Sequence, residues 1–255
     1  MTDINERKLN IRDRLLEYSQ NELEEKEKKE FAANKEANEL LFNNPTAYLF
    51  GVIFDQQVKA ERAWEAPLKL KKRLGHLDIE EISSMPKEEL VKIFREKPNL
   101  HRYPEKTAGW IKEASQKILR EYKGKTETIW KNVSNTRDIY RRLKAFKGIG
   151  QKKASMATNI LVRRMEIDVD NREGIDVSYD IHVRRVFLRT GLVDKDDKKE
   201  IIDTARKLNP EFPAALDTPA WKIGRKYCSP KNPKCSNCPI EEECAQKTDK
   251  NIETV

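Results

Sequence analysis

The chain has 255 residues, of which 37% are hydrophobic and 37% charged, and its 51 basic and 43 acidic side chains give a net charge of +8. No apolar stretch approaches the length of about 18 residues that a membrane-spanning helix needs, and the charged start MTDINERKLN lacks the apolar segment of a secretory signal. The sequence therefore predicts an intracellular protein without a membrane partner, and its positive charge suits a polyanion such as nucleic acid.

The N-terminal part is predicted to be helical. Residues 1–42 are expected to form one or two charged amphipathic helices, because leucines recur there at heptad spacing (Leu9, Leu16 and Leu23). We interpret the charged run ELEEKEKKE as a solvated helical face. Asn44 and Pro45 then have the identities of an N-cap and a first helical residue. The segment TAYLFGVIFDQQ that follows is apolar on nearly every side, which predicts a helix at the centre of the core.

The rest of the chain continues the helical pattern. Further helices are predicted at 58–74, 87–95, 106–122 and 134–145. After a polar loop at 166–179, we expect helices at 178–190, 197–208 and 217–227. Glycine and proline are few, and no convincing alternating strand pattern occurs. The predicted fold class is therefore all-α.

A glycine turn between two helices is the first feature that suggests chemistry. In LKAFKGIGQKKASMATNIL, residues 143–161, Gly148 and Gly150 permit a tight turn with positive φ and a close backbone approach. The turn presents the N–H groups of a helix N-terminus, and Lys147, Lys152 and Lys153 add positive charge around them. This arrangement predicts contacts with backbone phosphates. An ordinary turn with a glycine C-cap would give the same pattern, so the prediction needs a second motif.

The four cysteines form that second motif. Cys228, Cys235, Cys238 and Cys244 have the spacing C-x6-C-x2-C-x5-C, and no cysteine occurs elsewhere. Such a compact group without an export signal indicates a metal site rather than a disulfide framework. Zinc sites with four thiolates usually consist of two C-x2-C pairs, whereas this chain has one pair with a more distant cysteine on either side. The spacing favours a [4Fe–4S] cluster, and zinc remains the alternative.

A third motif completes the pattern. The segment DIHVRRV at 180–186 has the form D-x-H-x-x-R-V and lies between the glycine turn and the cysteines. In this order and spacing the three motifs resemble the endonuclease III branch of the helix-hairpin-helix DNA glycosylases, over about residues 45–246. The resemblance implies two helical domains with a DNA-binding cleft between them.

The resemblance also implies domain boundaries. One domain would have six helices, span residues 45–165 and end in the helix-hairpin-helix at 143–161. The other would be discontinuous, made of residues 1–44 plus 166–255, and would carry the iron–sulfur cluster loop at 228–244. We expect the protein to be a monomer.

Two catalytic residues follow from the family motifs. Asp180 takes the place of the carboxylate that stabilises positive charge on the sugar, although an Asp before a helix is also a common N-cap. Lys152 matches the Schiff-base lysine in the pattern G-h-G-x-K-x-A. As a neutral amine it would attack C1′, and β-elimination would then break the 3′ phosphodiester. Contact with phosphate alone is the simpler alternative for this lysine.

DNA contacts are implied for the surrounding residues. Lys147, Gly148, Gly150 and Lys153 would contact phosphates. Gln56 resembles the glutamine that fills the gap left by an extruded base, with the adjacent Gln57 as an alternative, and a surface glutamine at a helix end is the simpler interpretation. Lys147 stands where the family usually has proline.

The leading functional hypothesis is a base excision repair DNA glycosylase with AP lyase activity on damaged bases, oxidised ones in particular, in double-stranded DNA. A plain abasic site would also be a substrate. The second hypothesis is a monofunctional glycosylase for mismatched, deaminated or alkylated bases, against which Lys152 argues. The third is a non-catalytic DNA-binding module, against which the presence of both Lys152 and Asp180 argues. The loop at 168–179 is longer than the family leads us to expect, so the sequence does not identify the lesion.

Overall fold

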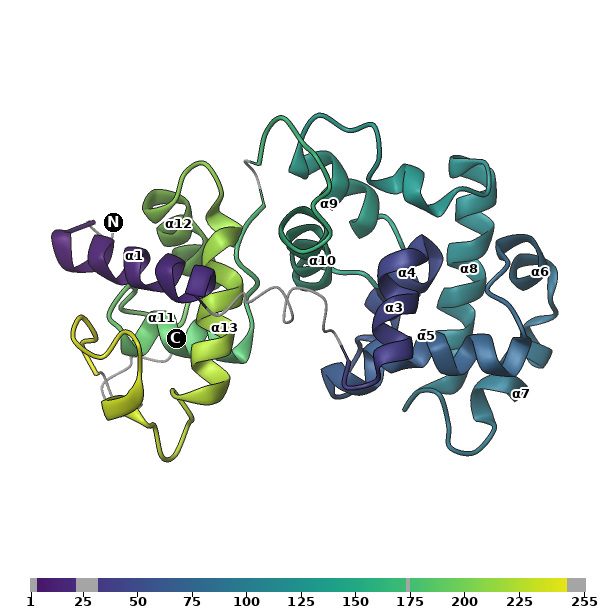
Figure 1. Cartoon of the computed structure of the whole chain (residues 1–255), viewed down its shortest axis with the longest axis horizontal. Coiled ribbons are helices and arrows are strands. Elements are labelled where there is room, and N and C mark those ends of the chain that lie inside the picture. The colour runs from purple at the N-terminus through teal and green to yellow at the C-terminus, as the bar shows by residue number, and fades with distance from the viewer. Residues whose placement is uncertain (1–3, 22–31, 173–174, 247–255) are drawn as a thin grey trace.

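The computed structural model of the chain describes residues 4–21, 32–172 and 175–246, and no strand occurs in these ranges (Figure 1). The ribbon has two lobes, with α9 and α10 lying between the outermost helices of each. The charged run ELEEKEKKE, together with Leu23, lies outside the described residues. The predicted all-α fold is confirmed, and none of the described helices is long and apolar enough to cross a membrane.

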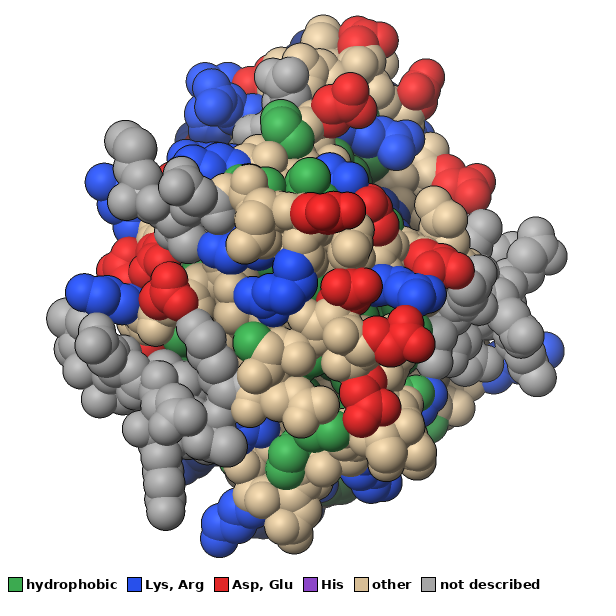
Figure 2. All heavy atoms as spheres, turned by 90° about the vertical axis from the view of Figure 1, so that its left-hand side faces the viewer, with side chains coloured by type: hydrophobic (Ala, Val, Ile, Leu, Met, Phe, Trp, Pro, Cys, Tyr) green, Lys and Arg blue, Asp and Glu red, His purple; other side chains and the backbone are tan. Residues whose placement is uncertain are grey.

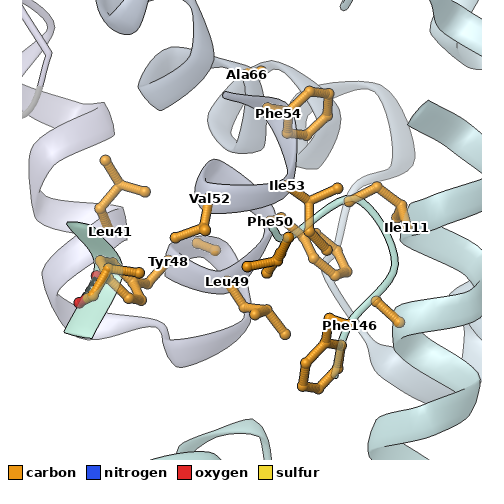
Figure 3. Close-up of a cluster of buried hydrophobic side chains, with 14 of the residues drawn as sticks. Leu41, Tyr48, Leu49, Phe50, Val52, Ile53, Phe54, Ala66, Ile111 and Phe146 are labelled. Atoms are coloured by element: carbon orange, nitrogen blue, oxygen red, sulfur yellow. Dashed lines mark hydrogen bonds between the residues drawn. The ribbon is translucent and has the colours of Figure 1, made fainter. Parts of the chain in front are cut away.

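The larger lobe is built from consecutive helices: α3 (Lys35–Asn43), α4 (Pro45–Phe54), α5 (Ala60–Leu74), α6 (Ile79–Ser84), α7 (Lys87–Arg95), α8 (Pro104–Tyr122), the 3-10 helix η1 (Thr126–Ile129), α9 (Thr136–Lys144) and α10 (Gln151–Arg163). Helix α4 lies at its centre, as its apolar sequence predicts. Asn44 caps this helix by accepting a hydrogen bond from the Ala47 N–H over 2.9 Å, and every residue from Thr46 to Phe54 is buried. Figure 3 shows side chains of α4 near Ile111 of α8 and Phe146 of the turn between α9 and α10.

The smaller lobe joins the two ends of the described chain. It contains α1 (Glu6–Asn21), α11 (Ile181–Arg189), α12 (Lys198–Leu208), the 3-10 helix η2 (Pro213–Leu216), α13 (Asp217–Lys226) and the 3-10 helix η3 (Cys235–Asn237). Ile11 and Leu15 of α1 are fully buried in its separate hydrophobic core. Arg7 also donates to the carbonyl oxygens of Thr190 over 2.6 Å and of Glu243 over 3.0 Å. The N-terminal helix therefore belongs with the C-terminal lobe.

The two hydrophobic cores suggest domain boundaries that differ from those implied by the family resemblance. Helix α3 packs on α4 and α5, and its Ala37 and Leu41 belong to the larger core, although the sequence placed residues 1–44 in the discontinuous domain. The larger core also reaches Val169, and the smaller core begins again at Val177. We propose boundaries between α1 and α3 and between Val169 and Val177.

Most predicted helices match the structure within a few residues, and the segment 166–179 contains no helix in its described part. Helix α6 was not predicted. It has only six residues and shows little periodicity, and it begins where the Asp78 carboxylate accepts a hydrogen bond from the Glu81 N–H over 2.9 Å. Local capping rather than a long apolar face defines this helix.

Candidate active site

Lys152 and Asp180 form an ion pair between the two lobes. Lys152 Nζ donates to Asp180 Oδ2 over 2.6 Å. The lysine is the second residue of α10, whose Ala154 and Leu161 lie in the larger core. The aspartate directly precedes α11, whose Val183 lies in the smaller core. The Lys152 side chain is 50% exposed and that of Asp180 only 5% exposed, so the amine is accessible while the carboxylate is held in place.

Asp180 has two partners, one for each carboxylate oxygen. Oδ2 accepts from Lys152, and Oδ1 accepts from the His182 N–H over 2.8 Å, which makes the residue the N-cap of α11. Burial raises the pKa of Asp180, but the hydrogen bonds from Lys152 and from the His182 N–H outweigh burial and hold the pKa below its usual value. Asp180 is therefore a carboxylate at neutral pH.

The glycine turn fits closely against α8. Gly148 has a φ of +85°, and a Cβ atom added there would lie 2.6 Å from Cε3 of Trp110. Gly150 begins α10 in an extended conformation. Among the described residues, no side chain caps the first N–H groups of α10, the helix that carries Lys152. Such a helix end can bind an anion, and the phosphate contact at this turn stays a prediction.

The two other lysines of the hairpin occupy different environments. Lys147 is exposed and forms an ion pair with Glu113 over 2.9 Å. Lys153 is only 6% exposed, and its Nζ donates to the Ile53 carbonyl oxygen over 3.1 Å and lies 5.9 Å from the centre of the Trp110 ring. Burial lowers its pKa to about 8. The phosphate contact predicted for Lys153 does not fit this position, because its side chain points into the larger lobe.

The loop after α4 carries the two glutamines. Gln56 is half-buried, whereas Gln57 is exposed, has a φ of +53°, and accepts a hydrogen bond from the Tyr103 hydroxyl over 2.8 Å. Gln57 borders a hollow of about 350 Å³. Other residues that line this hollow include Lys59, Arg62, Asn99, His101 and Arg102. Of the two candidates for filling a gap in the DNA stack, Gln57 is the one whose side chain the structure exposes.

A second carboxylate, that of Asp55, lies near the ion pair of Lys152 and Asp180. It ends α4, where its N–H donates to the Gly51 carbonyl oxygen over 3.1 Å. Burial raises its pKa, the charges of Lys153 and Lys152 lower it, and the charge of Asp180 raises it further. The sequence analysis did not single out Asp55, since no motif marks it. The available signal was an acidic residue at the end of an otherwise apolar helix.

The D-x-H-x-x-R motif joins α11 to α13. Arg185 donates from Nη2 to the Gly224 carbonyl oxygen over 2.8 Å, and the same nitrogen lies 3.0 Å from His182 Nδ1. The His182 ring meets Trp221 edge to face at 6.1 Å between ring centres. A Cβ atom on Gly224 would lie 2.7 Å from that of His182, so only glycine fits there without a shift. His182 therefore has a packing role.

The cysteine loop is anchored on α11 by two arginines one helical turn apart. Arg185 Nε donates to the Cys228 carbonyl oxygen over 2.6 Å. Arg189 donates to the carbonyl oxygens of Ser229 over 2.7 Å and of Pro230 over 2.8 Å, and its Nη1 lies 3.7 Å from Cys228 Sγ. The sequence analysis missed Arg189, although its spacing of four from Arg185 on one helix places both on the same face.

The four cysteines are half-buried free thiols that lie near one another. Burial, together with the charges of the neighbouring thiols Cys244, Cys228 and Cys235, raises the pKa of Cys238 to about 11. Among the residues that the structure describes, no three Cys, His, Asp or Glu side chains converge as a set for one metal ion. The loop thus gathers four sulfur donors without focusing them on a single point.

Basic side chains are not concentrated at the outer end of the smaller lobe. Figure 2 shows this face with Lys and Arg interspersed among Asp and Glu. An ion pair joins Arg14 of α1 to Glu242, which stands between Cys238 and Cys244 in the sequence, over 3.1 Å. The net positive charge of the chain therefore gives no uniform patch on this face.

Comparisons with known proteins agree with this arrangement. Endonuclease III of Thermotoga maritima is 22% identical over 202 residues, which cover 79% of this chain and 83% of that relative. A trapped endonuclease III–DNA covalent intermediate superposes with a TM-score of 0.66 at 19% identity, over 96% of this chain and 97% of the other. A thermostable thymine-DNA glycosylase superposes with a TM-score of 0.64 at 15% identity, over 95% of this chain and 97% of the other. These two likenesses show the shared fold.

The family model that matches the chain is described as "HhH-GPD superfamily base excision DNA repair protein" and covers residues 50–211. This range contains the glycine hairpin, the ion pair and most of the larger core. Because the match spans more than half of the chain, the protein belongs to the HhH-GPD superfamily of base excision DNA repair proteins.

Proposed function

We propose that this protein is a DNA glycosylase with an associated AP lyase activity, acting on damaged, oxidised bases in double-stranded DNA. The observation that carries the proposal is the hydrogen-bonded pair of Lys152 and Asp180 at the start of the hairpin's second helix. A nucleophile and a carboxylate within hydrogen-bond reach form the constellation that covalent cleavage of a glycosidic bond requires. The curated relatives that the chain matches, named endonuclease III, support the same activity.

Lys152 is the proposed nucleophile. Its proton would pass from Nζ to Asp180 Oδ2 across the existing hydrogen bond, which leaves a neutral amine. The amine would form a bond to C1′ of the extruded nucleotide while the bond from C1′ to the base breaks, with its electron pair leaving on the base. Asp180 would pass this proton on to the departing base and, as a carboxylate again, would stabilise the positive charge that develops on the sugar.

Strand cleavage would follow from the same adduct. Ring opening of the sugar converts the adduct into an imine between Lys152 and C1′, which acidifies the C2′ proton. Loss of that proton and departure of the 3′ phosphate by β-elimination break the strand, and water then releases the lysine. The accessible Lys152 side chain can contact DNA directly, which this chemistry demands.

DNA binding is proposed for the hairpin and the loop after α4. The uncapped N-terminus of α10 and the exposed Lys147 would hold phosphates, with Gly148 and Gly150 allowing the backbone to approach. Gln57 would occupy the space vacated by the extruded base. Ile181, 58% exposed and directly after Asp180, offers apolar surface to the extruded nucleotide.

The cysteine loop is the proposed site of a [4Fe–4S] cluster. Cys228, Cys235, Cys238 and Cys244 supply the four thiolates that such a cluster takes. The four thiols lie on one loop and close enough together to raise the pKa of Cys238, a donor set that fits such a cluster. The chemistry it supplies is the cross-linking of this loop by iron–thiolate bonds. Zinc stays the alternative occupant.

Borohydride trapping tests the catalytic proposal. Duplexes would carry thymine glycol, 8-oxoguanine, uracil, a G·T mismatch or a plain abasic site. We expect a covalent adduct on an oxidised-base duplex with the wild type and with Lys144→Ala, an exposed lysine in the first helix of the same hairpin, and none with Lys152→Ala. An adduct that persists in Lys152→Ala would overturn the assignment of the nucleophile. Base release from the mismatch or uracil duplex without any adduct would instead support the monofunctional glycosylase, which the fold shared with a thymine-DNA glycosylase also permits.

A further inference from the structure

One buried carboxylate takes no part in the chemistry proposed above. Asp217 is the first residue of α13 and is 7% exposed. Its Oδ1 accepts two hydrogen bonds from the same residue, one from the Ser178 N–H over 2.7 Å and one from the Ser178 hydroxyl over 2.6 Å. Ser178 is itself 3% exposed. A serine that satisfies both of its donors on one oxygen is fixed in backbone position and in side-chain rotamer.

Ser178 is directly linked to the catalytic carboxylate. Its carbonyl oxygen accepts a hydrogen bond from the Asp180 N–H over 2.8 Å. The described residues 175–180 form no helix, so the position of Asp180 depends on contacts from outside the segment. The Ala214 N–H donates to the Ile175 carbonyl oxygen over 3.1 Å and holds its start. Near the end of this segment, the two short hydrogen bonds from Ser178 to Asp217 attach it to α13.

The surroundings of Asp217 are electrostatically costly. Burial raises its pKa to about 6, the Ser178 hydrogen bonds lower it, the charge of Asp180 raises it and that of Lys152 lowers it. Arg163, at the end of α10, is the other charged group that acts on Asp217. No ion pair to Asp217 occurs among the described residues to offset its desolvation. An apolar side chain would fill this place without that cost but would leave the Ser178 N–H and hydroxyl unsatisfied.

We propose that Asp217 is a positioning residue for the catalytic pair: its carboxylate fixes Ser178, which holds the backbone of Asp180 so that Oδ2 meets Lys152 Nζ. The kinetic part of the inference rests on the proposed lyase function, and the structural part does not. Lys152 stands on the larger lobe and Asp217 on the smaller one. The hydrogen bonds from Ser178 to Asp217 and from the Asp180 N–H to Ser178, here called the clamp, therefore fix Asp180 on the smaller lobe, opposite the lysine that it meets.

Two measurements on the full-length protein test the proposal. The variants are Asp217→Ala, which removes the acceptor, Asp217→Asn, which keeps an Oδ1 acceptor, and Asp197→Ala. The last removes the carboxylate that caps α12, where Oδ1 accepts from the Glu200 N–H over 2.7 Å, in the same lobe but outside the site. Hydrogen exchange of the free protein is measured for a peptide spanning 175–182, with a peptide of α4 as the control for intact folding.

We expect exchange across 175–182 to be faster by about tenfold or more in Asp217→Ala and unchanged in Asp217→Asn and Asp197→Ala, with the α4 peptide protected throughout. On a duplex with one abasic site, the single-turnover cleavage rate should fall about 100-fold in Asp217→Ala with little change in DNA affinity. Asp217→Asn should recover the rate to within about threefold of the wild type, because it restores the acceptor.

Each failure has a separate meaning. If the wild type neither cleaves nor traps the abasic duplex, the proposed lyase function fails and the exchange data alone decide the clamp. Unchanged exchange in Asp217→Ala overturns the clamp whatever the activity. Faster exchange with an unchanged cleavage rate shows that the clamp does not position Asp180 for catalysis and overturns the inference. A loss of DNA affinity equal to the loss of rate assigns Asp217 a general structural role instead.

Discussion

The guanidinium of Arg185 donates from Nε to the carbonyl oxygen of Cys228 over 2.6 Å, which ties the helix capped by Asp180 to the first cysteine of the loop. Arg189, one turn further along α11, holds the next two residues of that loop. Asp180 therefore caps the start of a nine-residue helix whose middle and last residues hold the cysteine loop.

Metal content distinguishes the two proposed occupants of the loop. Protein prepared without oxygen is expected to contain about four iron atoms and four sulfides per chain if it holds the cluster, and about one zinc if it holds a single ion. Cys235→Ser should lose most of the bound iron, because it removes one of four ligands. Ser236→Ala, its neighbour in the same 3-10 helix, should retain it. Equal iron content in both variants would contradict the ligand assignment.

Asp180→Asn separates the two roles of that residue. Asparagine caps helices about as well as aspartate, so the free energy of unfolding should change by less than about 1 kcal/mol. The charge that pairs with Lys152 is lost, and we expect the single-turnover rate of base release to fall by about 10² to 10⁴. Thermal unfolding and quenched-flow assays measure the two effects. Asp197→Asn, at the cap of α12, is the control and should keep both values. A rate within tenfold of the wild type would remove Asp180 from the mechanism.

The sequence predicted those parts of the fold that local patterns specify. Helices with a long apolar face and a recognisable cap, such as α4 behind Asn44, lie where the periodicity places them. The short α6 depends on a single cap and was missed. The domain boundary that we propose places α3 with the larger core, which its amphipathic sequence alone did not indicate, because that sequence does not say which of two cores it joins.

The motifs singled out Lys152 and Asp180, but their pairing and their surroundings depend on tertiary contacts. Lys152 and Lys153 are adjacent in the sequence, yet successive helical residues point about 100° apart, so one reaches Asp180 while the other is buried. A helical signal existed: Lys153 lies four and eight residues before the buried Ala157 and Leu161, on the same face. Asp217 could not be found in this way, because Ser178 lies 39 positions away in a segment without helical periodicity.

Gly148→Ala should be the most harmful of three matched glycine substitutions. A side chain at φ +85° is strained, and its Cβ would also meet the Trp110 ring at 2.6 Å, so we expect a loss of about 3 kcal/mol in unfolding free energy. Gly75→Ala has a similar φ of +84° in open space and should cost only about 1 to 2 kcal/mol. Gly150→Ala has neither problem and should cost about 0.5 kcal/mol. Urea unfolding gives all three values, and equal losses at Gly148 and Gly75 would contradict the role of the ring contact.

The buried Lys153 predicts how stability depends on pH. Burial lowers its pKa from 10.5 to about 8, which corresponds to about 3 kcal/mol of penalty on the charged form in the folded protein. Between these two pH values the unfolded chain binds more protons than the folded one, so the stability contribution of this group rises as the pH increases. Below pH 8 the folded wild type carries the full penalty for a charged Lys153. Above pH 10.5 the side chain is neutral in the folded and the unfolded chain, and the penalty is absent.

Lys153→Met tests this sign directly. The variant lacks the titrating group, so its unfolding free energy relative to that of the wild type should decline by up to about 3 kcal/mol as the pH is raised from 8 to 10.5. Urea unfolding at closely spaced pH values measures the difference. Leu161→Ala, a core variant on the same face of α10, changes stability without removing a titrating group and should remain parallel to the wild type. Parallel curves for Lys153→Met would show instead that Lys153 titrates in the folded protein as it does in the unfolded chain.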